Sequence, residues 1–369
     1  MKIGYVGMNR ALKLTTSNTT RLNNVSPKKI KEKLLVNIDH LKKMLKWNVQ
    51  KNLLFFRIGS EFVPFASHEK VRDEEFKQEF NWIEECEDDL KEIGKFVKEN
   101  NIRISMHPDQ FVLINSPDME IFNRSYEELN YHAQLMNTMG LDTTHKFQIH
   151  LGGKYDDKRK SMQRFVDRYK NNLNDAIRAR CVLENDDRIY SLEDVYWIHQ
   201  QCGIPILFDT LHHECLNSNG DSLEVAFKKA ASTWDPVKDG VPLIDYSDQE
   251  PGARIGNHRK SIELKHFKKV ICDKLMKCKN DDGEFIEFDV MLEIKDKDAS
   301  AIKILPVFLK GVEDREKDPE PTEDDNQEDL KVQVLEEDED EAVSSEEEKP
   351  KKRKKAPTKK ASTTKRKKK

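Results

Sequence analysis

The sequence has little cysteine and no long apolar run, and each shortage excludes a class of protein. Its six cysteines in 369 residues form no C-x-x-C pair and no zinc-finger spacing, which fits a reducing compartment. No apolar run reaches the roughly 18 residues that a membrane-spanning helix needs. The N-terminal segment "MKIGYVGMNR" is too short in apolar length to be a signal peptide. We therefore expect an intracellular protein without a membrane partner.

The net charge of −4 conceals two oppositely charged blocks at the C-terminal end of the chain. Residues 311–348 contain 19 acidic and 3 basic residues, whereas residues 349–369 contain 13 basic residues and no acidic one. Residues 1–310 are nearly neutral, with 49 acidic and 48 basic residues. Segments as charged and as poor in aromatics as these two bury too little apolar surface to offset the entropy of ordering. We predict a folded domain over 1–310, an acidic disordered linker over 311–348 and a basic disordered tail over 349–369.

The basic tail holds two dense runs of lysine and arginine, "PKKRKK" at 350–355 and "KRKKK" at the end. Such runs serve as nuclear localisation signals or as nonspecific contacts to DNA phosphates. The alternative is a solvated low-complexity end that no receptor reads. In a eukaryotic host, the first interpretation predicts a nuclear protein.

Short apolar runs recur along the predicted folded domain, and each precedes a longer charged segment of helical character. The eight runs lie at 2–6, 53–58, 102–106, 145–150, 181–185, 204–209, 241–246 and 288–294. Helical candidates lie between them at 28–46, 76–100, 119–139, 158–179, 190–202 and 221–232, and "KDASAIKILPVFL" supplies a closing helix. Alternating strands and helices indicate a parallel sheet, because each parallel connection needs a crossover. Eight such units predict an α/β fold of the (β/α)8 TIM-barrel type. A doubly wound open sheet is the alternative, but no G-x-G-x-x-G or P-loop turn follows the first run.

Six consecutive predicted strands end on, or carry near their ends, a residue that can bind a metal. The third to eighth runs supply His107, His150, Glu184, Asp209, Asp245 and Glu293, while His212 and His258 follow in loops. The second run contributes Arg57, with His68 in the loop beyond it. In a barrel enzyme these strand ends build the active site. Each residue alone has a structural alternative, since a histidine at a strand end can have a purely structural role and a carboxylate can cap the following helix. Their joint occurrence favours a metal centre.

The donor types of these residues narrow the choice of metal. Imidazole and carboxylate ligands without thiolate favour manganese, zinc or iron over calcium or magnesium alone. There are more candidate ligands than one ion can accept, so we expect a cluster of two or three divalent ions. Clusters of this kind cleave phosphodiesters.

Seven segments of the chain, taken in order, resemble the motif series of the UV damage endonucleases. They are "GYVGMNR", "FFRIGSEFVPFASH", "ISMHPDQFVLINS", "VLENDD", "LFDTLHH", "YSDQEPGARIGNH" and "DVMLEIKDK", and together they span residues 1–310. The resemblance implies a metal-containing barrel related to endonuclease IV that nicks double-stranded DNA 5′ to UV photoproducts, with some family members also acting at abasic sites. We expect the enzyme to work as a monomer, with catalytic roles for Glu184 and Glu293 on the metal cluster. The metal ligands that it implies are His68, His107, His150, Glu184, Asp209, His212, His258 and Glu293.

The chain departs from the family pattern at two positions near the implied metals. Asp245 stands where the family usually has a further histidine ligand, and Leu243 stands where the family has a lysine. A carboxylate at residue 245 can still bind a metal, but it suits manganese or magnesium better than zinc. We therefore expect Mn²⁺, with Mg²⁺ or Zn²⁺ as alternatives.

The resemblance also implies which residues probe the damaged DNA. The matching positions are Tyr5 and Asn9 in the first loop, and Gln110 and Phe111 in the third. An aromatic wedge makes physical sense, because unstacking costs least at a distorted lesion. The alternative for Phe111 is a core position, given the apolar segment "FVLI".

Two other functions remain open from the sequence. One is a barrel enzyme acting on a small molecule, such as a sugar isomerase, because these enzymes also use His, Asp and Glu to bind metals. The other is a DNA-binding protein that kept the barrel and lost activity through Asp245 and Leu243.

Overall fold

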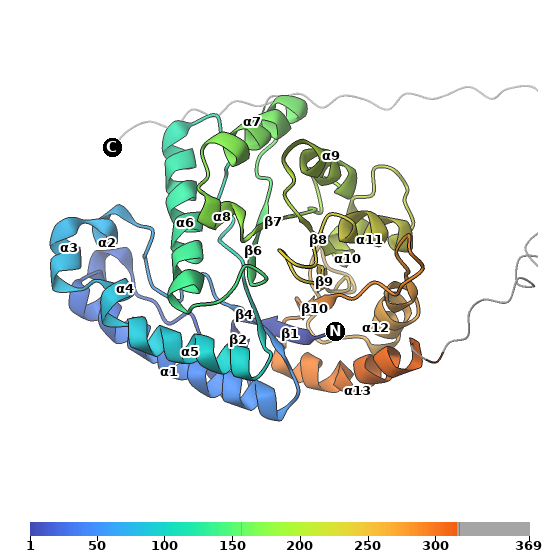
Figure 1. Cartoon of the computed structure of the whole chain (residues 1–369), viewed down its shortest axis with the longest axis horizontal. Helices are drawn as coiled ribbons and strands as arrows, with labels where there is room; N and C mark the ends of the chain where they lie inside the picture. The colour runs from blue at the N-terminus through green and yellow to red at the C-terminus, as the bar shows by residue number, and fades with distance from the viewer. Residues whose placement is uncertain (156, 316, 318–369) are drawn as a thin grey trace, which may run out of the picture. The chain divides into compact units, whose positions relative to one another are not determined.

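Eight parallel strands close into a barrel in the computed structural model, which confirms the predicted (β/α)8 TIM barrel (Figure 1). The structure describes residues 1–155, 157–315 and 317. Around the barrel the strands follow chain order, and β1 pairs with both β4 and β10 to close it. The strands are β1 Ile3–Val6, β4 Phe55–Ile58, β5 Arg103–Met106, β6 Lys146–His150, β7 Cys181–Glu184, β8 Ile206–Asp209, β9 Leu243–Tyr246 and β10 Asp289–Leu292. Each lies within one of the eight predicted apolar runs.

Helices connect the strands and lie outside them, as Figure 1 shows for α1, α5, α6 and α13. The longer helices are α1 Pro27–Gln50, α5 Glu87–Glu99, α6 Met119–Thr138, α7 Lys158–Asn171, α9 Leu192–Cys202, α11 Leu223–Ala231 and α13 Asp298–Arg315. In α1 the Ser26 side chain accepts a hydrogen bond from the backbone N–H of Lys29, and proline occupies the first turn. Such a cap satisfies an N–H that the helix itself leaves free. One face of α1, including Leu34, Leu41 and Leu45, packs on the barrel.

Several connections are more broken than the sequence predicted. The predicted helix 76–100 is divided into α3 Glu74–Glu79, α4 Trp82–Glu85 and α5, and the predicted helix 158–179 into α7 and α8 Asp175–Arg178. The Asn81 side chain accepts a hydrogen bond from a backbone N–H in the first turn of α4, and the Asn174 side chain does the same for α8. Asparagine side chains compete in this way with helix continuation. The remaining short elements are β2 Met8–Asn9, β3 Leu14–Thr15, α2 Glu69–Arg72, α10 Thr210–Cys215, α12 Leu264–Phe267, the 3-10 turns Leu22–Asn24 and Leu275–Lys277, and a π-helical turn Lys268–Cys272.

The last helix corrects the predicted end of the folded domain. Helix α13 continues past residue 310 to Arg315, whose side chain is buried and forms an ion pair with Glu287. Glu287 also pairs with the N-terminal ammonium group at 3.3 Å, so the two ends of the barrel domain are held together. Residues 311–315 therefore belong to a helix and not to the predicted linker. The rest of the predicted linker and the basic tail lie almost wholly outside the described residues. Within the described part, no helix is both long and apolar enough to cross a bilayer.

The barrel interior is layered, and the layers explain where polar side chains gather. Toward the amino ends of the strands, an apolar layer contains Phe55, Val182, Leu207, Leu243 and Met291, packed with Trp234. Successive residues of a strand point to opposite faces, so residue i+2 returns to the interior one layer higher. Each of these five strand residues is followed two positions later by a charged residue. These charged residues are Arg57, Glu184, Asp209, Asp245 and Glu293. A single alternation thus places a charged layer directly above an apolar one.

Candidate metal centre

The structure brings together most of the strand-end residues that the sequence singled out. Within the described chain their ligand atoms form three overlapping groups, each with its atoms within 4.8 Å of one another. The groups are His107, His150 and Glu184; Glu184, Asp209 and His212; and Asp209, Asp245 and Glu293. Because neighbouring groups share a carboxylate, they form one continuous cluster at the carboxyl ends of the strands.

Glu184 is the central residue of the cluster. Its Oε2 lies 3.5 Å from His107 Nε2 and 3.7 Å from His150 Nε2, and its Oε1 lies 3.2 Å from His212 Nδ1. The glutamate is buried, whereas the His107 and His150 side chains are 25% and 33% exposed. A phosphate group in solution can therefore approach the cluster from the side of these two histidines.

Three histidines of the centre are oriented by backbone carbonyls. The Nδ1–H groups of His107, His212 and His258 donate to the carbonyl oxygens of residues 108, 185 and 293, at 2.8–2.9 Å. These bonds fix the orientation of each ring. Metal-binding histidines are held in this way. His258 also lies 3.3 Å from Glu293 Oε2, which places it at the edge of the cluster.

Asp209 both caps a helix and offers an oxygen to a metal, the two roles that the sequence left open for it. Its Oδ1 accepts a hydrogen bond from the backbone N–H of His212 at 2.7 Å and so caps α10. Its Oδ2 is buried and has no hydrogen-bond partner. Burial raises the pKa of this carboxyl to about 6. A buried acceptor without a partner is costly, so this oxygen fits a ligand for a cation.

The electrostatics of His212 indicate that this region lacks positive charge. Burial alone would lower the pKa of His212, but the carboxylates of Asp209 and Glu184 raise it to about 11. A histidine that holds its proton so strongly lies in a site with surplus negative charge. Divalent cations would supply the missing charge, and the donor atoms present fit them.

Arg57 and Gln148 join the carboxylates of the third group. Arg57 Nη2 donates to both oxygens of Asp245, at 2.7 and 2.9 Å, and Nη1 donates to Glu293 Oε1. Gln148 Nε2 donates to Asp245 Oδ2 at 2.6 Å and to Glu184 Oε2 at 2.7 Å. The sequence had not indicated Gln148, although it lies two residues before His150 and therefore on the same face of β6. Asp245 is thus in the cluster, but its oxygens already accept hydrogen bonds.

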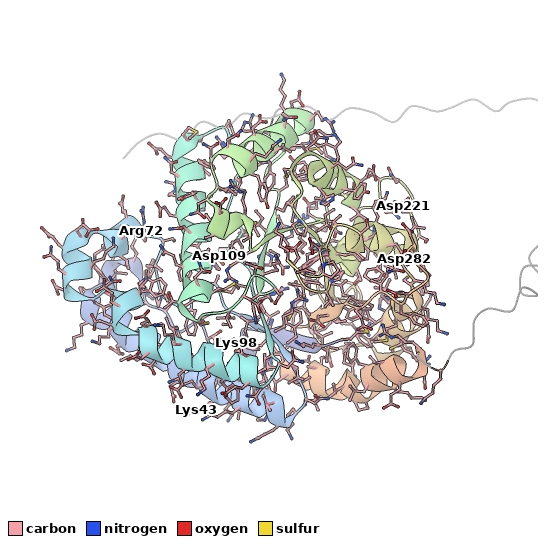
Figure 2. The ribbon with its side chains drawn as sticks, in the orientation of Figure 1. Lys43, Arg72, Lys98, Asp109, Asp221 and Asp282 are labelled. Atoms are coloured by element: carbon pink, nitrogen blue, oxygen red, sulfur yellow. The ribbon has the colours of Figure 1, made fainter. Side chains whose placement is uncertain are left out.

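His68, which the resemblance implied as a ligand, lies outside the three groups. It stands at the N-terminal end of α2, where its Nδ1 accepts a hydrogen bond from the backbone N–H of Lys70. Its ring contacts Phe65 edge-on, with the ring centres 6.1 Å apart. His68 lines a cavity together with Asp109, Arg72 and Glu128, beside the loop that carries Gln110; Arg72 and Asp109 are labelled in Figure 2.

The four predicted DNA-probing residues divide into two pairs. Tyr5 and Asn9 are fully buried: the Tyr5 hydroxyl donates to Asn48 Oδ1 at 2.7 Å and accepts from Asn9 Nδ2 at 2.8 Å. These two side chains therefore lie in the interior and not on a surface that DNA can reach. Gln110 and Phe111 are exposed, Phe111 by 76%, on the loop that follows His107. The core alternative for Phe111 is wrong, because Val112 and Ile114 turn inward instead.

Sequence comparisons match the barrel to one family. The model of the family described as UV-endonuclease UvdE matches residues 1–317. The UV DNA damage endonuclease of Clostridium perfringens (strain 13 / Type A) is 35% identical over 307 residues, covering 83% of this chain and 70% of that protein. The UV DNA damage endonuclease of Bacillus cereus (strain Q1) is 29% identical over 313 residues, covering 83% of this chain and 93% of that protein.

Structural comparisons agree with the sequence match. The crystal structure of SacUVDE has a TM-score of 0.75 and 38% identity, covering 84% of this chain and 98% of that chain. The crystal structure of endonuclease IV from Thermus thermophilus has a TM-score of 0.50 and 13% identity, covering 84% of this chain and 99% of that chain. At 13% identity this second likeness concerns the fold alone.

Proposed function

Because the chain belongs to the UV-endonuclease family, we propose that it is a metal-dependent endonuclease that nicks damaged double-stranded DNA 5′ to UV photoproducts. Abasic sites are proposed as a further substrate. The observation that carries the proposal is the position of Glu184, a buried carboxylate shared by two groups of metal-binding side chains. Ions bound there would activate water for attack and stabilise charge on the phosphate oxygens.

The chain's own residues prepare this chemistry. His107, His150 and Glu184 would hold one ion, and Glu184, Asp209 and His212 would hold another. Glu293 and His258 lie at the far edge, where Glu293 accepts a hydrogen bond from Arg57. We expect Mn²⁺, because imidazole mixed with carboxylate lies between the all-oxygen sites of Mg²⁺ and the thiolate-rich sites of structural Zn²⁺. All of these ligands come from one chain, so we propose that the enzyme acts as a monomer.

Metal removal tests the dependence on a cation. A chelator should abolish nicking of a duplex that carries one cyclobutane dimer, and Mn²⁺ should restore it, because the cluster's carboxylates and imidazoles cannot by themselves activate water strongly. A gel-based incision assay with the dialysed protein measures both effects. Undiminished nicking after complete metal removal would refute the metal centre. A folded protein that binds the duplex but does not nick it, whichever divalent ion is added, would instead support the DNA-binding alternative.

Gln110 and Phe111 are proposed to probe the base stack beside the lesion. Both are exposed and follow His107 closely, so they lie on the rim of the metal centre. The loop is held by a hydrogen bond from the Ser60 hydroxyl to Asp109 Oδ1 at 3.0 Å and by the turn that closes at Val112. An exposed aromatic on an anchored loop is suited to stacking against bases that a lesion has already loosened.

Replacing Phe111 with alanine should weaken selective binding to the damaged duplex by roughly 1–3 kcal/mol, the scale of one base–aromatic stack. Binding to undamaged duplex should change little, because phosphate contacts dominate it. The melting temperature should stay the same, since the side chain is 76% exposed. Binding isotherms with the two duplexes and one thermal melt measure these quantities.

A matched control for this variant is Val237→Ala. Val237 is also an exposed apolar residue, at 92%, but it precedes β9 and so lies toward the opposite end of the barrel. It should leave lesion preference unchanged. An unchanged lesion preference in Phe111→Ala as well would remove Phe111 from the proposed role, and Gln110→Ala then tests its neighbour alone.

We propose that the charged C-terminal segment increases DNA affinity and directs nuclear localisation, and that it takes no part in phosphodiester cleavage. Deleting residues 318–369 removes no candidate ligand and leaves α13 whole. The single-turnover nicking rate at saturating DNA should therefore be unchanged. The salt dependence of DNA binding should become shallower, because the basic runs contact phosphates in the full chain. A lost chemical step would show that the catalytic domain extends beyond residue 317. The nuclear address in a eukaryotic host is tested by moving residues 349–369 onto a reporter protein.

A further inference from the structure

The third group of carboxylates differs from the other two because it already contains a cation of the chain. We infer that the metal centre takes two divalent ions, and that the guanidinium of Arg57 permanently occupies the place of a third ion among Asp209, Asp245 and Glu293. The inference rests on the proposed metal-dependent function, and it assigns Arg57 as a positioning residue of the centre.

The contacts of Arg57 carry this inference. The side chain is 1% exposed and stands on β4, across the barrel from β9. It donates two hydrogen bonds to Asp245, one to Glu293 and one to the side-chain oxygen Oε1 of Gln148 at 2.5 Å. A guanidinium keeps its charge at every accessible pH. A change of pH therefore cannot remove this positive charge from its place among the carboxylates.

Both oxygens of Asp245 already accept hydrogen bonds from the chain. Its Oδ1 accepts from Arg57, and its Oδ2 accepts from both Arg57 and Gln148. The residue is 0% exposed, so solvent cannot take over these bonds when an ion arrives. A metal bound to Asp245 would compete with the ion pair that Arg57 Nη2 makes to both of its oxygens, and weakening a buried ion pair is unfavourable.

The other two groups show the opposite pattern. In the described part of the chain, Glu184 and Asp209 form ion pairs with histidines alone, and Asp209 Oδ2 has no hydrogen-bond partner. Histidines release a proton to accept a metal, whereas Arg57 cannot. These two groups are therefore open to ions, and the third is closed.

Formal charge leads to the same number of ions. The cluster contains four carboxylates, those of Glu184, Asp209, Asp245 and Glu293. Two divalent ions and Arg57 leave a surplus of one positive charge, which one DNA phosphate neutralises. A third divalent ion would leave a surplus of three in a buried site, where uncompensated charge is costly.

Counting the ions tests the inference without reference to activity. The full chain, equilibrated with MnCl₂ and desalted, should hold two Mn²⁺ per chain by native mass spectrometry and by elemental analysis. Asp245→Asn should still hold two, because residue 245 is not a ligand. Asp209→Asn, the matched change on the neighbouring strand, should hold fewer.

Each outcome has a distinct meaning. Three ions in the wild-type protein would overturn the inference, and that measurement requires no variant to fold. A folded Asp245→Asn protein with fewer than two ions would also overturn it, because Asp245 would then be a ligand. A wild-type protein that binds no divalent ion at all would refute the proposed metal centre itself.

Discussion

Replacing Glu184 with glutamine should lower the nicking rate on a lesion-bearing duplex by on the order of a thousandfold at saturating Mn²⁺. Glu184 belongs to both groups that are open to ions, so its loss affects both at once. Glutamine keeps the size of the side chain, but it offers one acceptor oxygen in place of two and carries no charge. Stabilisation by metal ions amounts to several kcal/mol, and each 1.36 kcal/mol is a factor of about ten in rate. Single-turnover nicking measures the effect.

A buried carboxylate at the other end of the same barrel provides the control. Asp289 is 3% exposed and pairs with Arg103 at 3.1 Å, toward the amino ends of the strands. Asp289→Asn should lower the stability of the fold and leave the chemical step intact. Glu293→Gln should also impair nicking, because Glu293 stands between Arg57 and His258. A Glu184→Gln protein that is folded and nicks at the wild-type rate would contradict the cluster.

Replacing Arg57 with methionine should lower the free energy of unfolding by about 3–5 kcal/mol, the cost of breaking a buried ion pair from one side. The change leaves the fully buried carboxylate of Asp245 without its cation. Chemical denaturation with a chelator present measures the loss, because bound ions would otherwise add their own stabilisation. Adding Asp245→Leu to the Arg57→Met protein should recover much of the loss, since the orphaned charge is then removed.

A surface ion pair provides the contrast for this variant. Lys43 pairs with Asp39 at 2.7 Å on α1, and both side chains are more than half exposed; Lys43 is labelled in Figure 2. Water screens such a pair, so Lys43→Met should leave the denaturation midpoint almost unchanged. If Arg57→Met behaves like Lys43→Met, the buried pair does not have the energetic role assigned to it.

The barrel and most of its metal centre could be predicted because they follow from a local rule. Apolar runs of five to seven residues contain the strands, and the residue at the end of each strand reaches the rim of the barrel. His107, His150, Glu184, Asp209 and Glu293 are all found in this way. Only the position of each residue within its own strand is needed, so no knowledge of distant contacts is required.

The features that sequence reasoning missed depend on contacts between distant segments. Asp245 meets Arg57 because β9 and β4 face each other across the barrel, a relation that neither strand encodes alone. Tyr5 and Asn9 are buried together: the Tyr5 hydroxyl donates to Asn48, near the end of α1, and accepts from Asn9. Phe111 looks like a core residue within "FVLI", but the turn from Asp109 to Val112 directs it outward.

The position of the nick on a damaged duplex tests the central claim most directly. The full chain with Mn²⁺ would be incubated with two duplexes of identical sequence, one of which carries a single cyclobutane dimer. Products would be resolved at single-nucleotide resolution. The account predicts one nick on the 5′ side of the dimer, in the damaged strand alone, and an intact undamaged duplex. Equal cleavage of both duplexes, or no cleavage with Mn²⁺, Mg²⁺ or Zn²⁺, would contradict it.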